Sequence, residues 1–410
     1  MHKNKKRILF ITIILFILFY SVIVFFIEKI DLYQLSSNKI TMTFLKIFIS
    51  IFLLELIFRL TYRYSTGHSY YFIPKIPFGK MYFEPHPHIP YVYKKEFQSQ
   101  KKTKAVYPLS EKDKTYYFDQ LVSNNYRHND GPNGNRNIII PKPKNQYRIL
   151  CLGASTTGNY ISYNGKNYSY PMELERYLNE EDQKTEYVVH NCGQGGWGSS
   201  DILINFLLNL YDTEPNAIII YHGYNDIKYY LTPNFASDYS HSKRNLGESI
   251  LYYRLANYIP NIPLKIYNAV INTIFPFMNP RHGIIGATSK NEPDYDLDFR
   301  GLQTYKRNIE HIVKICLKSK IKIVLSSYAH FLYPEIEESF IHNKYRKGVI
   351  LENEQIKEIS TKFNIPLIDN FRNIPYDNRH FVDSIHFTPL GMKFIAKGFG
   401  NEILSWGDEK

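Results

Sequence analysis

Three side chains in this sequence are suited to acyl-transfer chemistry. Ser155 follows an apolar run that ends at Gly153, and Asp383 and His386 lie three residues apart near the end of the chain. A serine hydroxyl is a weak nucleophile until a neighbouring base takes its proton, and a histidine oriented by a carboxylate is such a base. We therefore expect Ser155 to be the nucleophile, His386 the general base and Asp383 the group that fixes the imidazole tautomer.

Acyl transfer also needs hydrogen-bond donors for the oxyanion of the tetrahedral intermediate. The sequence offers a glycine-rich stretch at 190–198 and a polar stretch at 221–226. The backbone N–H groups of Ser155 and Gly196 and the side-chain amide of Asn225 are suitable donors, and losing one such donor typically costs about 10²–10³ in rate. These three residues form the expected oxyanion hole.

Each candidate also has an ordinary structural explanation. Ser155 could cap a helix, because serine is a preferred N-cap residue, and Asn225 with Asp226 could form a plain turn. His222 and His330 also follow apolar runs. We expect these two histidines to be structural or to contact the site residues without touching the substrate.

The residues around these candidates alternate between short apolar runs and helix-like stretches. Such alternation predicts βαβ units and a parallel sheet with helices on both faces, so that the candidate loops meet at the carboxyl ends of the strands. The expected strands are 148–152, 187–190, 217–221, 321–326 and 366–368, and the expected helices are 171–179, 202–211, 302–318 and 389 to about 404.

Two helix starts and one insertion can also be predicted. Asp201 is expected to cap one helix, and Thr388 before Pro389 is expected to cap the last one. The stretch 227–300 is long, aromatic and interrupted by proline and glycine. Such an insertion beside the carboxyl ends of strands is typical of a lid or a substrate-binding region.

Four blocks of the sequence together resemble a known superfamily, the SGNH hydrolases, which are the GDSL-like esterases and lipases. Residues 153–155 resemble its first block, 223–226 its third block and 383–386 its last block, in the same order and after successive predicted strands. The resemblance covers roughly residues 146–405. Each block is short, and the combination of four in register is what makes the resemblance specific.

The second block is the glycine-rich loop, where the family glycine best matches Gly196, with Gly193 and Gly195 as alternatives. Ala154 replaces the aspartate usual in the first block, which is not catalytic in the family. The resemblance implies the same triad and oxyanion donors as above. It also implies a flavodoxin-like, three-layer α/β/α fold with a mostly parallel five-stranded sheet.

The amino terminus predicts a membrane anchor. Residues 8–27 contain no charged side chain and are long enough to cross a bilayer, and the four basic residues before them favour an inside amino terminus. Residues 28–31 offer no small-residue cleavage site, so an uncleaved anchor is expected rather than a signal peptide. A second run at 40–60 contains Lys46 and Glu55 and is either a second spanning helix, which we favour, or an interfacial one.

The expected organisation has three parts. One or two transmembrane helices occupy 1–61, an extended Pro- and Tyr-rich arm occupies 62–145, and the catalytic domain with its 227–300 insertion occupies 146–410. Two crossings place that domain inside the cell, and the basic residues favour this arrangement. Ester chemistry on envelope polymers favours the outside, so the sequence leaves the side of the membrane open.

Composition excludes several other classes. The formal net charge is +12, but lysine and arginine are scattered along the chain, so nucleic acid is not an expected partner. Cys151, Cys192 and Cys316 have no metal-type spacing and imply no disulfide framework. His86 and His88 lack the partner ligands that a metal site needs. No metal or organic cofactor is expected.

These observations predict a membrane-anchored serine esterase that acts on acyl esters, acetyl esters among them, of a glycan or a lipid. An O-acyltransferase acting on a cell-envelope sugar is the nearest alternative, because the same groups can pass the acyl group to a sugar hydroxyl. A non-catalytic glycan- or lipid-binding module is the alternative from another class. It predicts that Ser155 and His386 lie too far apart for proton transfer.

Overall fold

The computed structural model describes the part of the chain that carries the predicted catalytic blocks. Apart from Ile49, the described residues all belong to one compact unit, formed by Ile76–Lys243 and Gly283–Lys410. The described residues are 83–84, 88–89, 92–93, 95–96, 103–104, 117–118, 122–130, 136–164, 166–231, 235–239, 241, 297–332 and 340–407, with Ile49.

A five-stranded parallel sheet forms the centre of this unit. Its strands lie in the order β11-β10-β9-β5-β8. The first strand of the sheet along the chain therefore lies between the second and the third, which is the 2-1-3-4-5 order of flavodoxin-like folds. The strands are β5 (Gln146–Gly153), β8 (Glu186–Asn191), β9 (Ala217–Tyr221), β10 (Lys322–Ser326) and β11 (Leu367–Ile368).

The apolar runs became strands because both faces of this sheet are covered. In β5 the side chains of Ile149, Leu150 and Cys151 have no exposed surface, and β9 is buried along its whole length. Continuous burial requires a continuous apolar run instead of the alternation found in half-exposed strands. The structure confirms the prediction of an α/β fold with a parallel five-stranded sheet.

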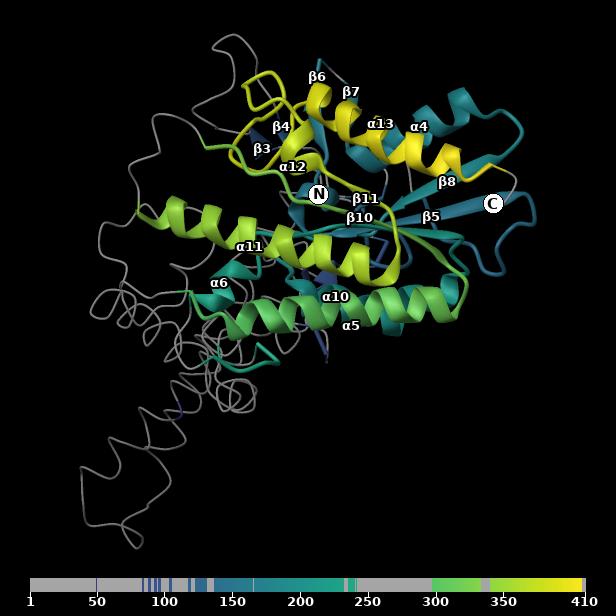
Figure 1. Cartoon of the computed structure of the whole chain (residues 1–410). Coiled ribbons are helices and arrows are strands. Elements are labelled where there is room, and N and C mark those ends of the chain that lie inside the picture. The colour runs from purple at the N-terminus through teal and green to yellow at the C-terminus, as the bar shows by residue number, and fades with distance from the viewer. Residues whose placement is uncertain are drawn as a thin grey trace, which may run out of the picture. The chain divides into compact units, whose positions relative to one another are not determined.

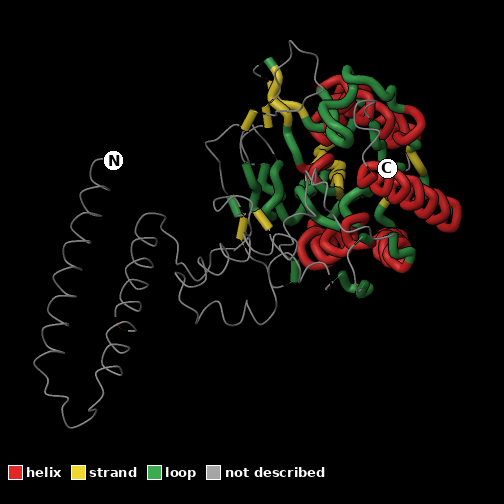
Figure 2. The backbone as a smooth tube through the Cα atoms, turned by 90° about the vertical axis from the view of Figure 1, so that its left-hand side faces the viewer, coloured by secondary structure: helices red, strands yellow, loops and turns green. Residues whose placement is uncertain are grey.

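Helices cover both faces of the sheet, which gives three layers (Figure 1). Helices α4 and α13 lie on one face, and α5, α10 and α11 lie on the other. Figure 2, turned by 90°, again shows helices on both sides of the strands. The bounds are α3 (Ser155–Gly158), α4 (Tyr170–Glu181), α5 (Ser199–Asn205), η3 (Phe206–Leu210), η4 (Tyr211–Thr213), α6 (Ile227–Tyr230), α10 (Arg300–Lys318), α11 (Phe340–Phe363), α12 (Asn370–Asn373) and α13 (Pro389–Ser405).

Short strands from the predicted arm form two smaller sheets. Strands β1 (Phe83–Glu84) and β2 (Val92–Tyr93) pair antiparallel. A four-stranded antiparallel sheet joins two arm strands to two strands that follow Ser155. Its members, in sheet order, are β3 (Thr103–Lys104), β4 (Tyr117–Phe118), β6 (Ile161–Tyr163) and β7 (Lys166–Tyr168).

One of the two predicted helix caps is correct. Thr388 is the N-cap of α13, where its hydroxyl accepts a hydrogen bond from the Gly391 N–H at 3.2 Å. The prediction for Asp201 was wrong by three positions. Gly198 is the N-cap of α5, and Asp201 in the first turn reaches back to accept the Gly198 N–H at 3.0 Å. An acidic side chain is also favourable in the first turn, because the amino-terminal end of a helix carries partial positive charge.

The predicted membrane runs at 8–27 and 40–60 lie outside the described residues, apart from Ile49. Among the helices of the described residues, none has the length and apolar character needed to cross a membrane. Most of the 227–300 insertion also lies outside them. The anchor and the lid therefore stay predictions.

Candidate functional site

Ser155 lies where strand β5 ends and helix α3 begins, at the carboxyl edge of the sheet. Gly153 ends the strand, Ala154 is the N-cap, and Ser155 is the first residue of α3. The next residue anchors this turn through its side chain. Thr156 Oγ1 lies 2.5 Å from the Tyr328 hydroxyl. The Ser155 side chain is thus held at the start of a short, fixed helix, and the residue keeps 8% of its surface exposed.

Glycines allow the loops at this edge to approach one another closely. A Cβ atom at Gly153 would lie 2.1 Å from Thr157 Oγ1. A Cβ at Gly158 would lie 2.6 Å from the carbonyl oxygen of Gly193, and one at Gly193 would lie 2.5 Å from the Gly158 nitrogen. The turn at 153–158, which carries Ser155, and the glycine-rich loop therefore contact backbone to backbone, with no room for a side chain between them.

The loop that carries Asp383 and His386 is closed like a hairpin. Val382 N–H donates to the His386 carbonyl at 2.9 Å, and Phe381 and Phe387 form an isolated antiparallel bridge. Both phenylalanines are almost fully buried. Burial of these rings fixes the loop on the core, so the two polar side chains between them have a defined position.

The predicted triad residues form one chain of hydrogen bonds. His386 Nε2 lies 3.0 Å from Ser155 Oγ, and His386 Nδ1 lies 2.7 Å from Asp383 Oδ2. Asp383 Oδ1 also accepts the backbone N–H groups of Ile385 and His386, at 2.8 and 2.7 Å. Burial by itself would raise the pKa of Asp383, but the His386 charge and these hydrogen bonds outweigh it and hold the pKa below its usual value. The carboxylate is therefore ionised at neutral pH.

The glycine-rich loop passes beside Ser155. A Cβ at Gly195 would lie 3.8 Å from the Ser155 Cβ. Gly193 N–H donates to Asn191 Oδ1 at 3.1 Å. Gly195 N–H donates to the Tyr93 hydroxyl, and burial nevertheless raises the pKa of Tyr93 to about 12. Both alternatives to Gly196 thus already have hydrogen-bond acceptors.

Gly196 itself has a conformation that favours glycine. Its φ is 80°, in the left-handed region that L side chains rarely adopt. Its carbonyl accepts a hydrogen bond from Lys228 Nζ at 2.9 Å. Asn225, in the turn after β9, donates its amide Nδ2 to the Trp197 carbonyl at 3.0 Å. Two side chains from the third block region therefore hold the peptides on either side of Trp197.

A buried carboxylate, Asp226, ties the third block to the second. Ser199 N–H donates to Asp226 Oδ2 at 2.8 Å, and the Ser199 and Tyr239 hydroxyls donate to Oδ1 at 2.5 and 2.7 Å. His222 Nε2 lies 2.6 Å from Oδ2. Burial would raise the pKa of Asp226, but the hydrogen bonds from His222, Ser199 and Tyr239 lower it below its usual value. His222 thus has a structural place in this network.

Replacing Asp226 by asparagine is expected to lower the free energy of unfolding by about 3 kcal/mol at pH 7, because a fully buried carboxylate loses its charge while its donors remain. The folded-state pKa lies below the unfolded one, so the stabilisation exists above pH ~4 and disappears in more acidic solution. Urea unfolding at pH 7 and pH 3 measures the difference. The control is Asp369→Asn, at a partly exposed carboxylate, which should change stability far less. Equal losses at both pH values would contradict this account.

The structure also contains a second Asp-x-x-His pair, which the sequence interpretation did not consider. His380 Nδ1 lies 2.7 Å from Asp377 Oδ1, as in the pair at Asp383 and His386. The His380 ring packs edge-on against Phe394. Spacing and local hydrogen bonding therefore fit both pairs, and the distance to Ser155 Oγ is what distinguishes His386.

The remaining candidates have structural surroundings. His330 is fully buried, with its ring 5.5 Å from that of Tyr224. Cys151, Cys192 and Cys316 are free and buried. His86 lies outside the described residues. Among the residues that the structure describes, no group of three or more His, Cys, Asp and Glu side chains is placed to hold a metal ion.

Comparisons with known proteins give similar solved structures. No family model and no curated protein matches this chain. It is similar to a lipase/acylhydrolase from Enterococcus faecalis, with 15% identity, coverage of 63% of this chain and 95% of the other, and a TM-score of 0.38. It is also similar to Axe2, an acetylxylan esterase from Geobacillus stearothermophilus (14%, 63% and 94%, 0.38), and to the acetyl xylan esterase AlAXEase (13%, 62% and 99%, 0.37). At this level of similarity, the residues themselves must carry the functional argument.

Proposed function

We propose that this protein is a serine ester hydrolase of the SGNH type. One observation carries the proposal, namely the hydrogen-bonded series Ser155 Oγ, His386 and Asp383, with separations of 3.0 and 2.7 Å. These distances lie within the range for a nucleophile, its base and the group that orients the base. The binding-module alternative predicts a separation too long for proton transfer, and the observed distance speaks against it.

The mechanism follows from the order of these contacts. Ser155 Oγ attacks the ester carbonyl carbon while His386 Nε2 takes the hydroxyl proton, and the carbonyl π electrons move to the oxygen. When the tetrahedral intermediate collapses, the alcohol leaves with the proton from His386. Water then attacks the acyl-serine with His386 again as base, which releases the acid and restores Ser155. Asp383 keeps the imidazole in the tautomer that can accept a proton at Nε2.

The oxyanion is stabilised by the Ser155 and Gly196 N–H groups and by the Asn225 amide. Gly193 and Gly195 are less suitable, because their N–H groups donate to Asn191 Oδ1 and to the Tyr93 hydroxyl. One hydrogen of the Asn225 amide is held by the Trp197 carbonyl. The other remains for the oxyanion, so the bond to Trp197 orients the donor before substrate binds.

The substrate is an acyl ester of a glycan or a lipid, and the enzyme is anchored in the cell membrane by its apolar amino-terminal run. The run at 8–27 supports this localisation because of its length, its lack of charge and the basic residues before it. An anchored enzyme meets substrates at or near the membrane. Transfer to a sugar hydroxyl would use the same acyl-serine, so an assay for this protein should include sugar acceptors.

Covalent labelling tests the proposal directly. The full-length protein in detergent is treated with a fluorophosphonate probe, and the modified peptide is mapped by mass spectrometry. We expect a single adduct on Ser155 and none in Ser155→Ala. Ser405→Ala, at a serine near the end of α13, is the matched control and should label like the wild type. Folded wild-type protein that shows no adduct, or an adduct on another serine, would remove the basis of the proposal.

A further inference from the structure

A short segment before the sheet, residues 122–130, contacts two parts of the proposed site. These are the glycine-rich loop and the short helix that begins with Ser155. We call the segment the lead-in loop. Ser123 and Asn129 form an antiparallel bridge across it, and Asn124 Oδ1 accepts the N–H groups of Tyr126 and His128, at 2.9 and 3.1 Å. The loop is thus held in one shape by its own hydrogen bonds.

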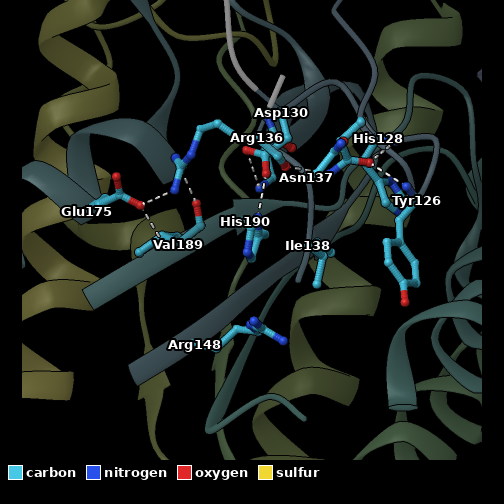
Figure 3. A network of polar contacts seen from close by, with 12 residues as sticks. Tyr126, His128, Asp130, Arg136, Asn137, Ile138, Arg148, Glu175, Val189 and His190 are labelled. Atoms are coloured by element: carbon cyan, nitrogen blue, oxygen red, sulfur yellow. Dashed lines mark hydrogen bonds and ion pairs between the residues drawn. The ribbon is translucent and has the colours of Figure 1, made fainter. Parts of the chain in front are cut away.

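The last residue of the lead-in loop, Asp130, binds the entrance of the glycine-rich loop. Asp130 Oδ2 lies 2.6 Å from His190 Nδ1, and Oδ1 accepts the backbone N–H of Asn191 at 3.2 Å. Figure 3 shows the carboxylate of Asp130 above the imidazole of His190. The two residues are 1% and 3% exposed, so water competes little for these bonds. His190 and Asn191 end strand β8, directly before the glycines.

Other residues of the lead-in loop reach further along the same surface. The His128 ring meets Trp197 edge-on, with 6.3 Å between ring centroids. Asn129 Nδ2 donates to the carbonyl of Gly158, the last residue of the nucleophile helix, at 3.1 Å. The lead-in loop therefore touches the glycine-rich loop near both of its ends and the helix that starts with Ser155.

The charged groups near Asp130 leave its carboxylate to His190 and the Asn191 N–H. Burial lowers the pKa of His128 to about 4, although the Asp130 charge opposes this, so His128 is neutral at pH 7. Arg136 is directed to Glu175, with which it forms a 2.6 Å ion pair, as Figure 3 shows. The contacts of the Asp130 carboxylate with His190 and the Asn191 N–H are thus its direct ones here.

We infer that Asp130, acting through His190 and the Asn191 N–H, is a positioning residue that fixes the glycine-rich loop and with it the Gly196 oxyanion donor. A loop with four glycines in six residues has much backbone freedom to lose, and an external clamp reduces it. A displacement of about 1 Å in a catalytic group can cost about 10²-fold in rate. The inference rests on the proposed function and adds a residue that touches neither the substrate nor the triad.

The test compares two Asp→Asn variants in the full-length protein, with p-nitrophenyl acetate as the ester probe. The two aspartates contact residues near opposite ends of β8. Asp130→Asn is expected to lower kcat about 10- to 100-fold, with KM changed less than about threefold. Asp182→Asn is the control, because Asp182 accepts the Tyr187 hydroxyl at 2.8 Å near the other end of the strand. It is expected to keep the wild-type kcat. Thermal unfolding of both variants is measured in parallel.

A second pair of variants separates positioning from folding. His190→Asn keeps a side-chain donor near the position of Nδ1, whereas His190→Ala removes it, so we expect the first to retain more of kcat at equal melting temperature. If Asp130→Asn does not fold, this pair decides the question.

Two outcomes would overturn the inference alone. One is that the wild type is active and Asp130→Asn has the same kcat. The other is that kcat falls in proportion to the melting temperature in all four variants. A folded wild type without esterase activity would overturn the proposed function, and this inference with it.

Discussion

Asp383→Asn is expected to lower kcat about 10⁴-fold while leaving the fold intact. Asparagine can still accept the Ile385 and His386 backbone N–H groups through Oδ1, so the loop keeps its shape. Its amide group would then face His386 Nδ1 and donate to it. The imidazole proton would move to Nε2, the nitrogen that faces Ser155 Oγ at 3.0 Å. His386 would be in the wrong tautomer to take the serine proton.

The second Asp-x-x-His pair supplies the matched control. Asp377→Asn makes the same change next to His380, whose ring packs against Phe394. We expect this variant to keep kcat within about twofold of the wild type, since His380 has no part in the proposed proton transfer. Steady-state rates with p-nitrophenyl acetate compare the variants. Similar losses in both, or none in Asp383→Asn, would mean that Asp383 does not set the tautomer of the catalytic base.

Asn225→Asp is expected to lower kcat by at least about 10²–10³-fold, with a smaller change in KM. The substitution replaces a donor by a carboxylate of the same shape. One oxygen would face the Trp197 carbonyl, where the amide now donates at 3.0 Å, and negative charge would oppose the developing oxyanion. The effect falls on the transition state, where that charge appears, so kcat should change more than KM.

A remote asparagine in a similar setting is the control for Asn225→Asp. Asn179 also donates its amide to a backbone carbonyl, that of Tyr187, at 2.9 Å. Asn179→Asp should therefore suffer the same carbonyl repulsion, lose some stability and keep kcat. The oxyanion role of Asn225 would be rejected if both variants showed the same ratio of lost stability to lost rate.

Much of the central sheet could be predicted because burial on both faces requires continuous apolar runs. The expected strand 217–221 has those bounds in the structure, and 148–152 lies inside β5. Parallel strands bring their carboxyl ends to one edge, so loops 231 residues apart in sequence, at Ser155 and His386, could be expected to meet. The distance between them could not be predicted, because it depends on how Phe381 and Phe387 pack.

The sequence did not indicate which residues the lead-in loop contacts, for a physical reason. Its bonds connect Asp130 with His190 and Asn129 with Gly158, over separations of 60 and 29 residues. The local pattern of apolar and polar residues in the sequence does not indicate contacts between residues so far apart. The wrong N-cap prediction at Asp201 also has a physical cause. An aspartate near the start of a helix suits both the N-cap and the third helical position. Only the backbone conformation of Gly198 decides between them.

The backbone contact between Gly158 and Gly193 limits how this protein can change. A side chain at either position would force the nucleophile turn and the glycine-rich loop apart, because added carbon atoms would lie within 2.6 Å of backbone atoms. Adaptation to a new ester, by natural drift or in a designed library, therefore has to leave these two positions as glycine. Variation is better directed to side chains around the site that do not lie between these two backbone segments.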